Sequence, residues 1–260
     1  MIVDTHCHAG LEKYEPVESV VDQMFRHRVD AGVLVQHLGQ YDNQYLVDVA
    51  ARYPGRFAVL VMVDVTRDDA PERLAYWAAK ANVRGARIKA ADRSPGKNPW
   101  AIWEAADALG MSITLNGKAS DYSSDTTLEL ARRFPKLRMV VEHLGRPSLA
   151  DGPNGAEFKR TLRLAELPNV WLKISGFHVF GEASTQHYPE WTPFIRAGLS
   201  AFGAERCMWA TNYPPVSNAE GYHNTITHAR DHWPWKDDRE RRLVMGDNAA
   251  AHYLLAQKQD

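Results

Sequence analysis

The stretch Ile2-Val3-Asp4-Thr5-His6-Cys7-His8 joins a short apolar run to two histidines, and it opens a pattern that recurs along the whole chain. Its apolar, β-branched start is typical of a buried strand. Pro16 then precedes the amphipathic pattern Val-Glu-Ser-Val-Val-Asp-Gln-Met, which indicates a helix. A second apolar run, Gly32 to Gln36, follows that helix. A strand, a helix and another strand in this order predict one crossover unit of a parallel sheet.

Similar units continue to the end of the chain, and eight strands are predicted in all. The predicted strands are Ile2 to His6, Gly32 to Gln36, Phe57 to Val63, Gly85 to Lys89, Ser112 to Leu115, Met139 to Glu142, Val170 to Ile174 and Met208 to Thr211. Their starts fall roughly 25 to 40 residues apart, which leaves room for one helix and two loops per unit. The sequence therefore predicts an α/β fold in which residues 1–260 form a single (β/α)8 TIM barrel, with an open doubly wound sheet as the alternative.

The composition favours a small-molecule substrate. Lys and Arg number 31 against 32 Asp and Glu, and no block of like charge indicates a nucleic-acid or membrane partner. Cys7 and Cys207 are too few for a disulfide framework, and no apolar run approaches the ~18 residues of a membrane span. We therefore expect a cytoplasmic protein. Barrels often pair through their outer helices, so a homodimer is left open.

Three histidines mark the ends of strands one and six. Side chains two apart on a strand point to the same side, so His6 and His8 are expected to converge. His143 ends strand six, and the carboxyl ends of barrel strands meet at one face. Such histidines can share a metal ion or donate hydrogen bonds to a developing oxyanion. A pair of hydrogen-bonded core histidines is the structural alternative for His6 and His8.

Strand eight is followed by a position where a hydrolase ordinarily carries a carboxylate. The stretch from Cys207 to Pro215 is an apolar strand that ends in polar residues and two prolines. Strand eight neighbours strand one in a closed barrel, so Asn212 is expected beside His6 and His8. A carboxylate at that place could take a proton from water, whereas an amide cannot.

Polar side chains at the other strand ends are candidates for substrate binding. Lys89 and Arg87, two residues apart on strand four, predict two cations for a substrate carboxylate, with an ion pair as the alternative for Arg87. His178 lies in the segment Gly176 to Pro189, which together with the loop Ala150 to Ala156 could wall or cover the pocket, and solvent exposure is its alternative. The predicted substrate-binding residues are Gln36, Arg87, Lys89, Asn116, His178 and Tyr213.

Several ordered segments resemble the amidohydrolase-related (Amidohydro_2) branch of the amidohydrolase superfamily, which includes sugar lactonases and 2-pyrone-4,6-dicarboxylate hydrolase. The resemblance covers nearly the whole chain and implies a distorted (β/α)8 barrel that hydrolyses lactones or related esters. The segments that carry it are Ile2 to His8, Ala131 to Pro135, Glu142 to Pro147, Leu167 to Gly176, Met208 to Pro214 and Gly246 to Ala250.

The resemblance also implies roles for individual residues. His6 and His8 match the strand-one pair of the family and His143 matches its strand-six histidine, while Asn212 stands where the family has an aspartate. That departure is either a natural change of chemistry or an engineered one. Asn116 falls at the strand-five end, where many relatives carry another histidine, which argues against a two-metal site. The expected cofactor is therefore none, or one zinc or manganese ion held by His6, His8 and His143.

These observations lead to one preferred hypothesis. The chain is expected to open a lactone or related cyclic ester, with carboxylated substrates included. His6, His8 and His143 would polarise the carbonyl, and residue 212 would serve the attacking water. Lys89 would pair with an acid group of the substrate. One alternative is a metal-dependent decarboxylase of an aromatic or unsaturated acid. The other is a base-deficient protein that binds such a ligand without efficient turnover.

Overall fold

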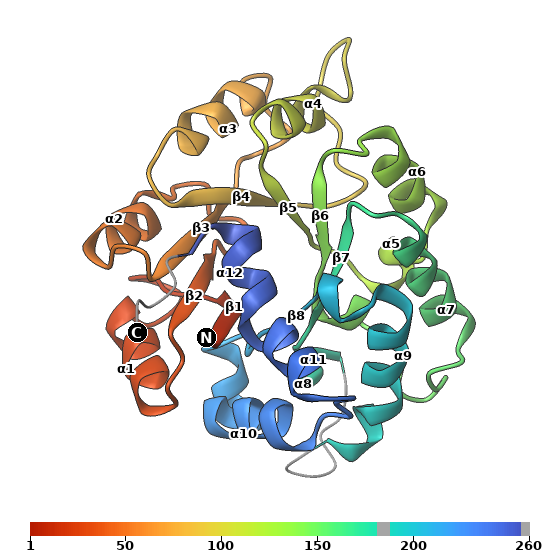
Figure 1. Cartoon of the computed structure of the whole chain (residues 1–260). Coiled ribbons are helices and arrows are strands. Elements are labelled where there is room, and N and C mark those ends of the chain that lie inside the picture. The colour runs from red at the N-terminus through yellow and green to blue at the C-terminus, as the bar shows by residue number, and fades with distance from the viewer. Residues whose placement is uncertain (181–187, 256–260) are drawn as a thin grey trace.

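The computed structural model describes residues 1–180 and 188–255, and in them eight parallel strands stand side by side in chain order (Figure 1). The strands are β1 (Val3–Cys7), β2 (Ala31–Val35), β3 (Phe57–Val61), β4 (Val83–Ile88), β5 (Ser112–Leu115), β6 (Arg138–Val141), β7 (Val170–Ile174) and β8 (Cys207–Trp209). Each overlaps its predicted range. The predicted TIM barrel is therefore confirmed, and the open doubly wound sheet is excluded by the strand order.

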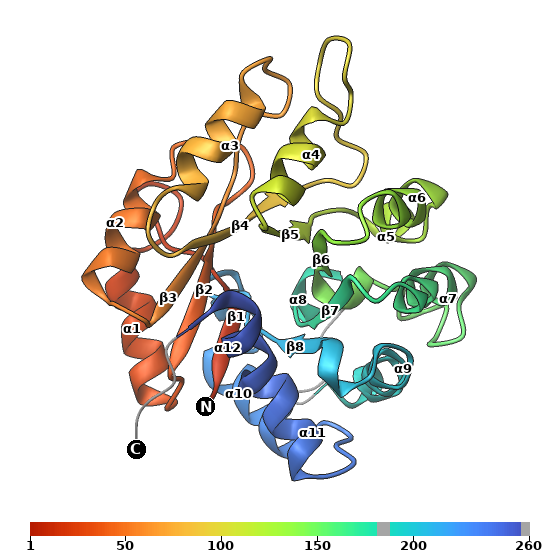
Figure 2. The ribbon, with the colours of Figure 1, turned by 45° about the horizontal axis from the view of Figure 1, so that its top comes forward.

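Helices follow the strands and form a ring around them (Figures 1 and 2). The α-helices are α1 (Val17–Arg26), α2 (Gln44–Arg52), α3 (Ala70–Ala78), α4 (Ala101–Ala108), α5 (Ala119–Tyr122), α6 (Asp125–Arg133), α7 (Ala156–Leu162), α8 (Phe177–Phe180), α9 (Thr192–Phe202), α10 (Gly221–Thr227), α11 (Asp238–Arg242) and α12 (Asn248–Tyr253). Shorter 3-10 and π turns are His143–Gly145, Arg163–Glu166, Pro189–Trp191, Ala204–Arg206, Pro215–Asn218, His228–His232 and Leu243–Asp247.

Hydrogen bonds between β1 and the residues after β8 close the barrel. The backbone N–H of Asn212 donates to the carbonyl of His6 at 2.9 Å, and that of His8 donates to the carbonyl of Tyr213 at 2.8 Å. The buried carboxylate of Asp4 accepts from both the backbone N–H and the hydroxyl of Thr211, at 2.9 and 2.5 Å. Strand eight therefore ends at Trp209 rather than at Thr211 as predicted, because Thr211 is bonded to a side chain.

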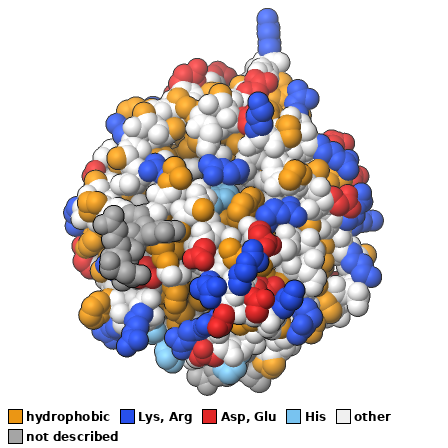
Figure 3. Space-filling view, in the orientation of Figure 1, with side chains coloured by type: hydrophobic (Ala, Val, Ile, Leu, Met, Phe, Trp, Pro, Cys, Tyr) orange, Lys and Arg blue, Asp and Glu red, His pale blue; other side chains and the backbone are white. Residues whose placement is uncertain are grey.

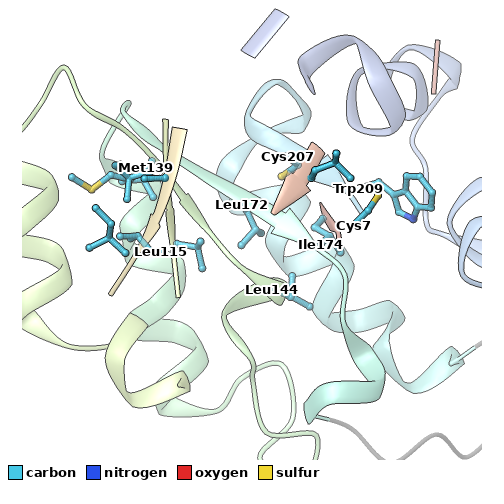
Figure 4. Close-up of a cluster of buried hydrophobic side chains, with 14 of the residues drawn as sticks. Cys7, Leu115, Met139, Leu144, Leu172, Ile174, Cys207 and Trp209 are labelled. Carbon is cyan, nitrogen blue, oxygen red and sulfur yellow. The ribbon is translucent and has the colours of Figure 1, made fainter. Parts of the chain in front are cut away.

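Apolar side chains fill the space between the strands and the surrounding helices. Every residue of β2 and β3 is buried, as expected when helices cover a parallel sheet. Figure 4 shows part of this core, including Leu115, Leu172 and Trp209, all of which have 1% exposure or less. This packing holds the strands rigidly, so side chains at their carboxyl ends keep fixed positions.

Helix α12 lies against the amino ends of the strands. His252 in this helix contacts the hydroxyl of Ser112 at 2.7 Å, and its carbonyl accepts from Arg138 at 3.1 Å, at the starts of β5 and β6. On the face seen in Figure 1, acidic and basic side chains are interspersed (Figure 3). In the part of the chain that the structure describes, no helix has the length and apolar character needed to span a bilayer.

Candidate active site

A chain of hydrogen bonds runs from Lys173 on β7 through His6 on β1 to His8, which follows that strand. Lys173 Nζ lies 3.3 Å from His6 Nδ1, and His6 Nε2 lies 3.2 Å from His8 Nε2. His8 Nδ1 lies 2.7 Å from the carbonyl oxygen of Val35. His6 and His8 therefore converge as predicted, and they do so in direct contact with each other.

The direction of this chain follows from its two ends. Burial lowers the pKa of Lys173 to about 8, which leaves mainly the ammonium form at neutral pH, and an ammonium only donates. His6 Nδ1 must then accept, so the proton of a neutral His6 sits on Nε2 and is donated to His8. At the other end, the carbonyl of Val35 only accepts, so His8 carries its proton on Nδ1. Lys173 and Val35 together fix the tautomers of both histidines.

Lys173 had no place among the predicted site residues. Its side chain is fully buried within the apolar strand Val170–Ile174, where a lone lysine is rare. That contrast between a cation and an apolar strand was the signal available in the sequence.

Glu142, at the end of β6, balances the cations inside the barrel. Arg87 on β4 donates to it twice, from Nε and Nη2, both at 2.8 Å, and Asn116 donates from Nδ2 at 3.0 Å. Oε1 of Glu142 lies 3.8 Å from His6 Nδ1. The guanidinium of Arg87 is buried in this ion pair, which was the alternative to its predicted contact with substrate. Asn116 likewise supports Glu142 from the end of β5.

All three histidines are neutral at physiological pH. Burial is the main cause, and it lowers the pKa of His8 to about 3 and the pKa values of His6 and His143 well below their ordinary value. Lys173 lowers the pKa of His6 further by charge repulsion. The histidines therefore act as neutral hydrogen-bonding groups and not as cations, and the proton of His8 is already donated to the carbonyl of Val35.

His143 begins an unusual left-handed turn. Residues 143–146 all have positive φ (51°, 56°, 74° and 53°), and only the third, Gly145, is a glycine. Left-handed backbone costs roughly 1–2 kcal/mol per non-glycine residue and is found preferentially at functional sites. The turn brings the ring of His143 to 4.8 Å from that of His6, measured between centroids, while Ser175 Oγ lies 3.0 Å from His143 Nδ1. His143 therefore joins the strand-one pair as predicted.

Gly176 makes room for the His143 ring. A Cβ atom at this position would lie 2.4 Å from His143 Nδ1, and the φ of Gly176 is +73°. We expect Gly176→Ala to displace His143 and to lower kcat/KM roughly 10- to 100-fold in a steady-state hydrolysis assay. Gly110→Ala is the matched control, because Gly110 also has positive φ, at +63°, but no atom lies within 4 Å of its Cβ position. Equal losses in the two variants would show that backbone strain, not displacement of His143, is the cause.

The side chain of Asn212 contacts the ring of His178. Its Nδ2 lies 3.1 Å from His178 Nε2, and His178 Nδ1 lies 3.6 Å from Oε1 of Glu220. The side chain of His178 is only 7% exposed, so the solvent-exposed alternative for this residue was wrong. His178 lies on α8, which occupies the start of the segment predicted as a loop; residues 181–187 of that segment lie outside the described part. Glu220 was not predicted.

The remaining predicted residues lie around the mouth with separate contacts. Both ends of the Gln36 amide bind its own loop, at Asp42 and at the N–H of residue 37. The hydroxyl of Tyr213 donates to Glu15 at 3.4 Å. Lys89 is exposed just beyond β4, so it does not share the buried environment of Arg87. Substrate contact by these residues stays a prediction.

The three histidines do not fit a metal ion as they are arranged. A histidine ligand must present an unprotonated ring nitrogen. Both nitrogens of His6 are engaged, Nδ1 as an acceptor from Lys173 and Nε2 as a donor to His8. Across residues 1–180 and 188–255, no three His, Cys, Asp or Glu side chains are grouped so as to hold a metal.

The chain belongs to the amidohydrolase family, because the family model described as Amidohydrolase (Amidohydro_2) matches residues 3–255. It is a hydrolase of this family. Among named relatives, it is 32% identical over 250 residues to L-fucono-1,5-lactonase of Burkholderia ambifaria, covering 88% of this chain and 82% of that protein. It is 27% identical over 241 residues to 2-pyrone-4,6-dicarboxylate hydrolase of Comamonas testosteroni, covering 82% and 76%.

Solved structures share the fold over nearly the whole chain. A Pseudomonas putida protein described as a 2-pyrone-4,6-dicarboxylic acid hydrolase has a TM-score of 0.84 at 22% identity, covering 99% of this chain and 98% of that one. An amidohydrolase of Burkholderia multivorans with bound zinc has a TM-score of 0.81 at 20% identity, covering 98% and 100%. A manganese-bound dihydroxybenzoic acid decarboxylase of Polaromonas has a TM-score of 0.74 at 13% identity, covering 99% and 98%.

Proposed function

We propose that this chain opens a lactone or a related cyclic ester by hydrolysis, with His6 and His143 donating hydrogen bonds to the carbonyl oxygen and His8 supporting them. The observation that carries the proposal is the directed chain from Lys173 through His6 to His8, which holds a proton on His6 Nε2. A substrate carbonyl oxygen can replace His8 Nε2 as the acceptor of that proton. Relatives named as a lactonase and as a pyrone hydrolase support the same substrate class.

The charges around His6 suit the transition state of this reaction. Attack on an ester carbonyl places a negative charge on its oxygen, and preorganised donors in a buried site stabilise that charge most effectively. Two cations, Lys173 and Arg87, lie beside the His6 ring together with the carboxylate of Glu142, and the Asp4 carboxylate accepts from the backbone N–H of His6. The ammonium of Lys173 and the guanidinium of Arg87 would favour the negative charge of a developing oxyanion at His6.

Cationic groups near the mouth favour a substrate that bears a carboxylate. Lys89 is exposed at the end of β4, and Arg146 ends the left-handed turn that begins at His143. The Nε of Arg146 has no hydrogen-bond partner in the described part of the chain, and in the proposal this guanidinium pairs with the acid group. A cavity of about 150 Å³ lies beside the ends of β1 and β2 and is lined in part by Ala9 and Gln36.

A pH-indicator assay on a panel of neutral sugar lactones and carboxylated lactones tests the proposal. We expect ring opening of at least one lactone. The kcat/KM for carboxylated lactones should be roughly 10-fold higher than for neutral lactones of the same ring size. Treatment with a chelator should not lower the activity. Carbon dioxide release from aromatic acids is measured in parallel. The expected result there is none.

Each part of the proposal has its own failure. Equal turnover of neutral and carboxylated lactones would show that Lys89 and Arg146 do not bind a substrate carboxylate. The proposal of lactone hydrolysis itself would still stand. Loss of turnover on chelation, restored by zinc or manganese, would overturn the metal-free arrangement. If the panel stays intact while carbon dioxide is released, the chain is a decarboxylase.

A further inference from the structure

The side chain at position 212 and His178 form a matched donor and acceptor. Asn212 Nδ2 lies 3.1 Å from His178 Nε2, and an amide nitrogen only donates, so Nε2 of His178 carries a lone pair there. The proton of the neutral ring is then on Nδ1, on the side of Glu220 at 3.6 Å. A carboxylate at position 212 could only accept and would not pair with that lone pair. The amide at 212 therefore selects the form of His178 that can take up a proton.

The surroundings of His178 are built to hold this form. Phe177, its neighbour on α8, stacks on Trp191 with ring centroids 5.6 Å apart and planes at 20°. Glu220 also accepts a hydrogen bond from the hydroxyl of Tyr188. Burial alone would raise the pKa of Glu220, but the hydrogen bond from Tyr188 and the nearby His178 ring, 3.6 Å away, keep it below its ordinary value, so Glu220 is a carboxylate at neutral pH. A carboxylate behind the ring stabilises an imidazolium.

We propose that His178, backed by Glu220, accepts the proton of the attacking water, which replaces Asn212 as the hydrogen-bond donor to Nε2, and that Asn212 then holds the water. This inference rests on the proposed lactone hydrolysis and assigns its general base. The lone pair of His178 Nε2 lies within hydrogen-bond distance of residue 212, where the resemblance places the aspartate of the family. The proton acceptor has thus moved from one side chain to its direct neighbour.

The step balances without any further reactant. The water oxygen bonds to the carbonyl carbon while one water proton passes to His178 Nε2, and the imidazolium is paired with Glu220. The ring carbon–oxygen bond then breaks, and the same proton passes from Nε2 to the released alkoxide oxygen. One water is added to give a hydroxy acid, and nothing is oxidised or reduced.

Four proteins test the assignment: the wild type, His178→Gln, Asn212→Asp and the double variant. Glutamine at 178 can still accept a hydrogen bond from Asn212 but cannot take up a proton. We expect kcat/KM for lactone opening to fall about 100-fold in His178→Gln and to change less than about 10-fold in Asn212→Asp. In the double variant it should recover to within about 10-fold of the wild type, because the new carboxylate at position 212 accepts the proton instead. His223→Gln, at an exposed histidine, is the control.

Three outcomes overturn the assignment. Activity of His178→Gln within about threefold of the wild type would show that His178 takes no proton. A gain of about 100-fold or more in Asn212→Asp alone would show that the wild type lacks its base. A loss in His178→Gln that the double variant does not recover would give His178 a structural role only. If none of the four proteins opens any lactone, the proposed function itself fails. That result is distinct from the three outcomes above, in which at least one protein still opens a lactone.

Discussion

Glu142→Gln should lower the free energy of unfolding by about 3–5 kcal/mol, the usual cost of removing one partner from a buried ion pair. Arg87 donates to both carboxylate oxygens at 2.8 Å, and Asn116 donates to one of them at 3.0 Å. Glutamine offers one oxygen to these donors and turns an N–H toward a buried guanidinium. The measurement is chemical denaturation of both proteins at pH 7, followed by tryptophan fluorescence.

Glu18→Gln is the matched control for this substitution. Glu18 pairs with Arg52 at 3.4 Å, but its side chain is 60% exposed, so the loss should stay below about 1 kcal/mol. If Glu142→Gln were no more destabilising than this control, the buried pair would not stabilise the barrel.

The same carboxylate predicts how stability responds to acid. Burial alone would raise the pKa of Glu142, but Arg87 and the neighbouring donors hold it well below its ordinary value. A carboxyl whose pKa is depressed on folding stabilises the fold above its unfolded pKa, and this contribution is lost as the pH falls toward the folded pKa. The wild type should therefore lose stability more steeply than Glu142→Gln below about pH 4.

Lys173→Met should lower kcat/KM about 10³-fold while leaving the free energy of unfolding unchanged or higher. Methionine removes the ammonium that fixes the proton of His6 on Nε2, so the donor to the carbonyl oxygen loses its orientation. It also removes a buried charge, and Glu142 keeps Arg87 as its partner. Steady-state kinetics and denaturation of the same preparation measure the two effects.

The pH profile separates this role from a packing role. Burial lowers the pKa of Lys173 to about 8, so wild-type kcat/KM should fall above pH 8 as the ammonium is lost, after subtraction of uncatalysed ring opening. Lys173→Met should lack that fall, and the exposed Lys136→Met should keep it. A Lys173→Met enzyme with near wild-type activity would refute the directed hydrogen-bond chain.

The barrel could be predicted because each strand carries its own local signal. Apolar runs such as Phe57 to Val61 alternate with amphipathic helical patterns, and only a parallel sheet accommodates that order. Strand ends were less certain where a side chain competes with the sheet, as Asp4 does when it accepts from Thr211. Such a bond joins residues far apart in the chain and leaves no local trace.

The site was predicted at its strand ends but not in its interior. His6, His8 and His143 were found because histidines at strand ends point to one face. Lys173 lies within a strand, and its contact with His6 depends on closure of the barrel, which leaves only β8 between β7 and β1. The partner of Asn212 was missed for a related reason, since His178 lies on a short helix whose orientation no spacing rule gives.

The closure of the barrel has a consequence for how the protein folds. The bonds that join β1 to the end of β8 are made by His6, His8 and Asn212, residues that belong to the candidate active site. These partners are separated by about 200 residues, and closing a loop of that length costs conformational entropy before the contact is gained. During synthesis His6 and His8 therefore lack their hydrogen-bond partners, Asn212 and Tyr213, until β8 and the residues after it have been made. The pairing of β1 with the end of β8 thus completes the barrel and the candidate active site together. Enzymatic activity should therefore report on whether the chain has finished folding.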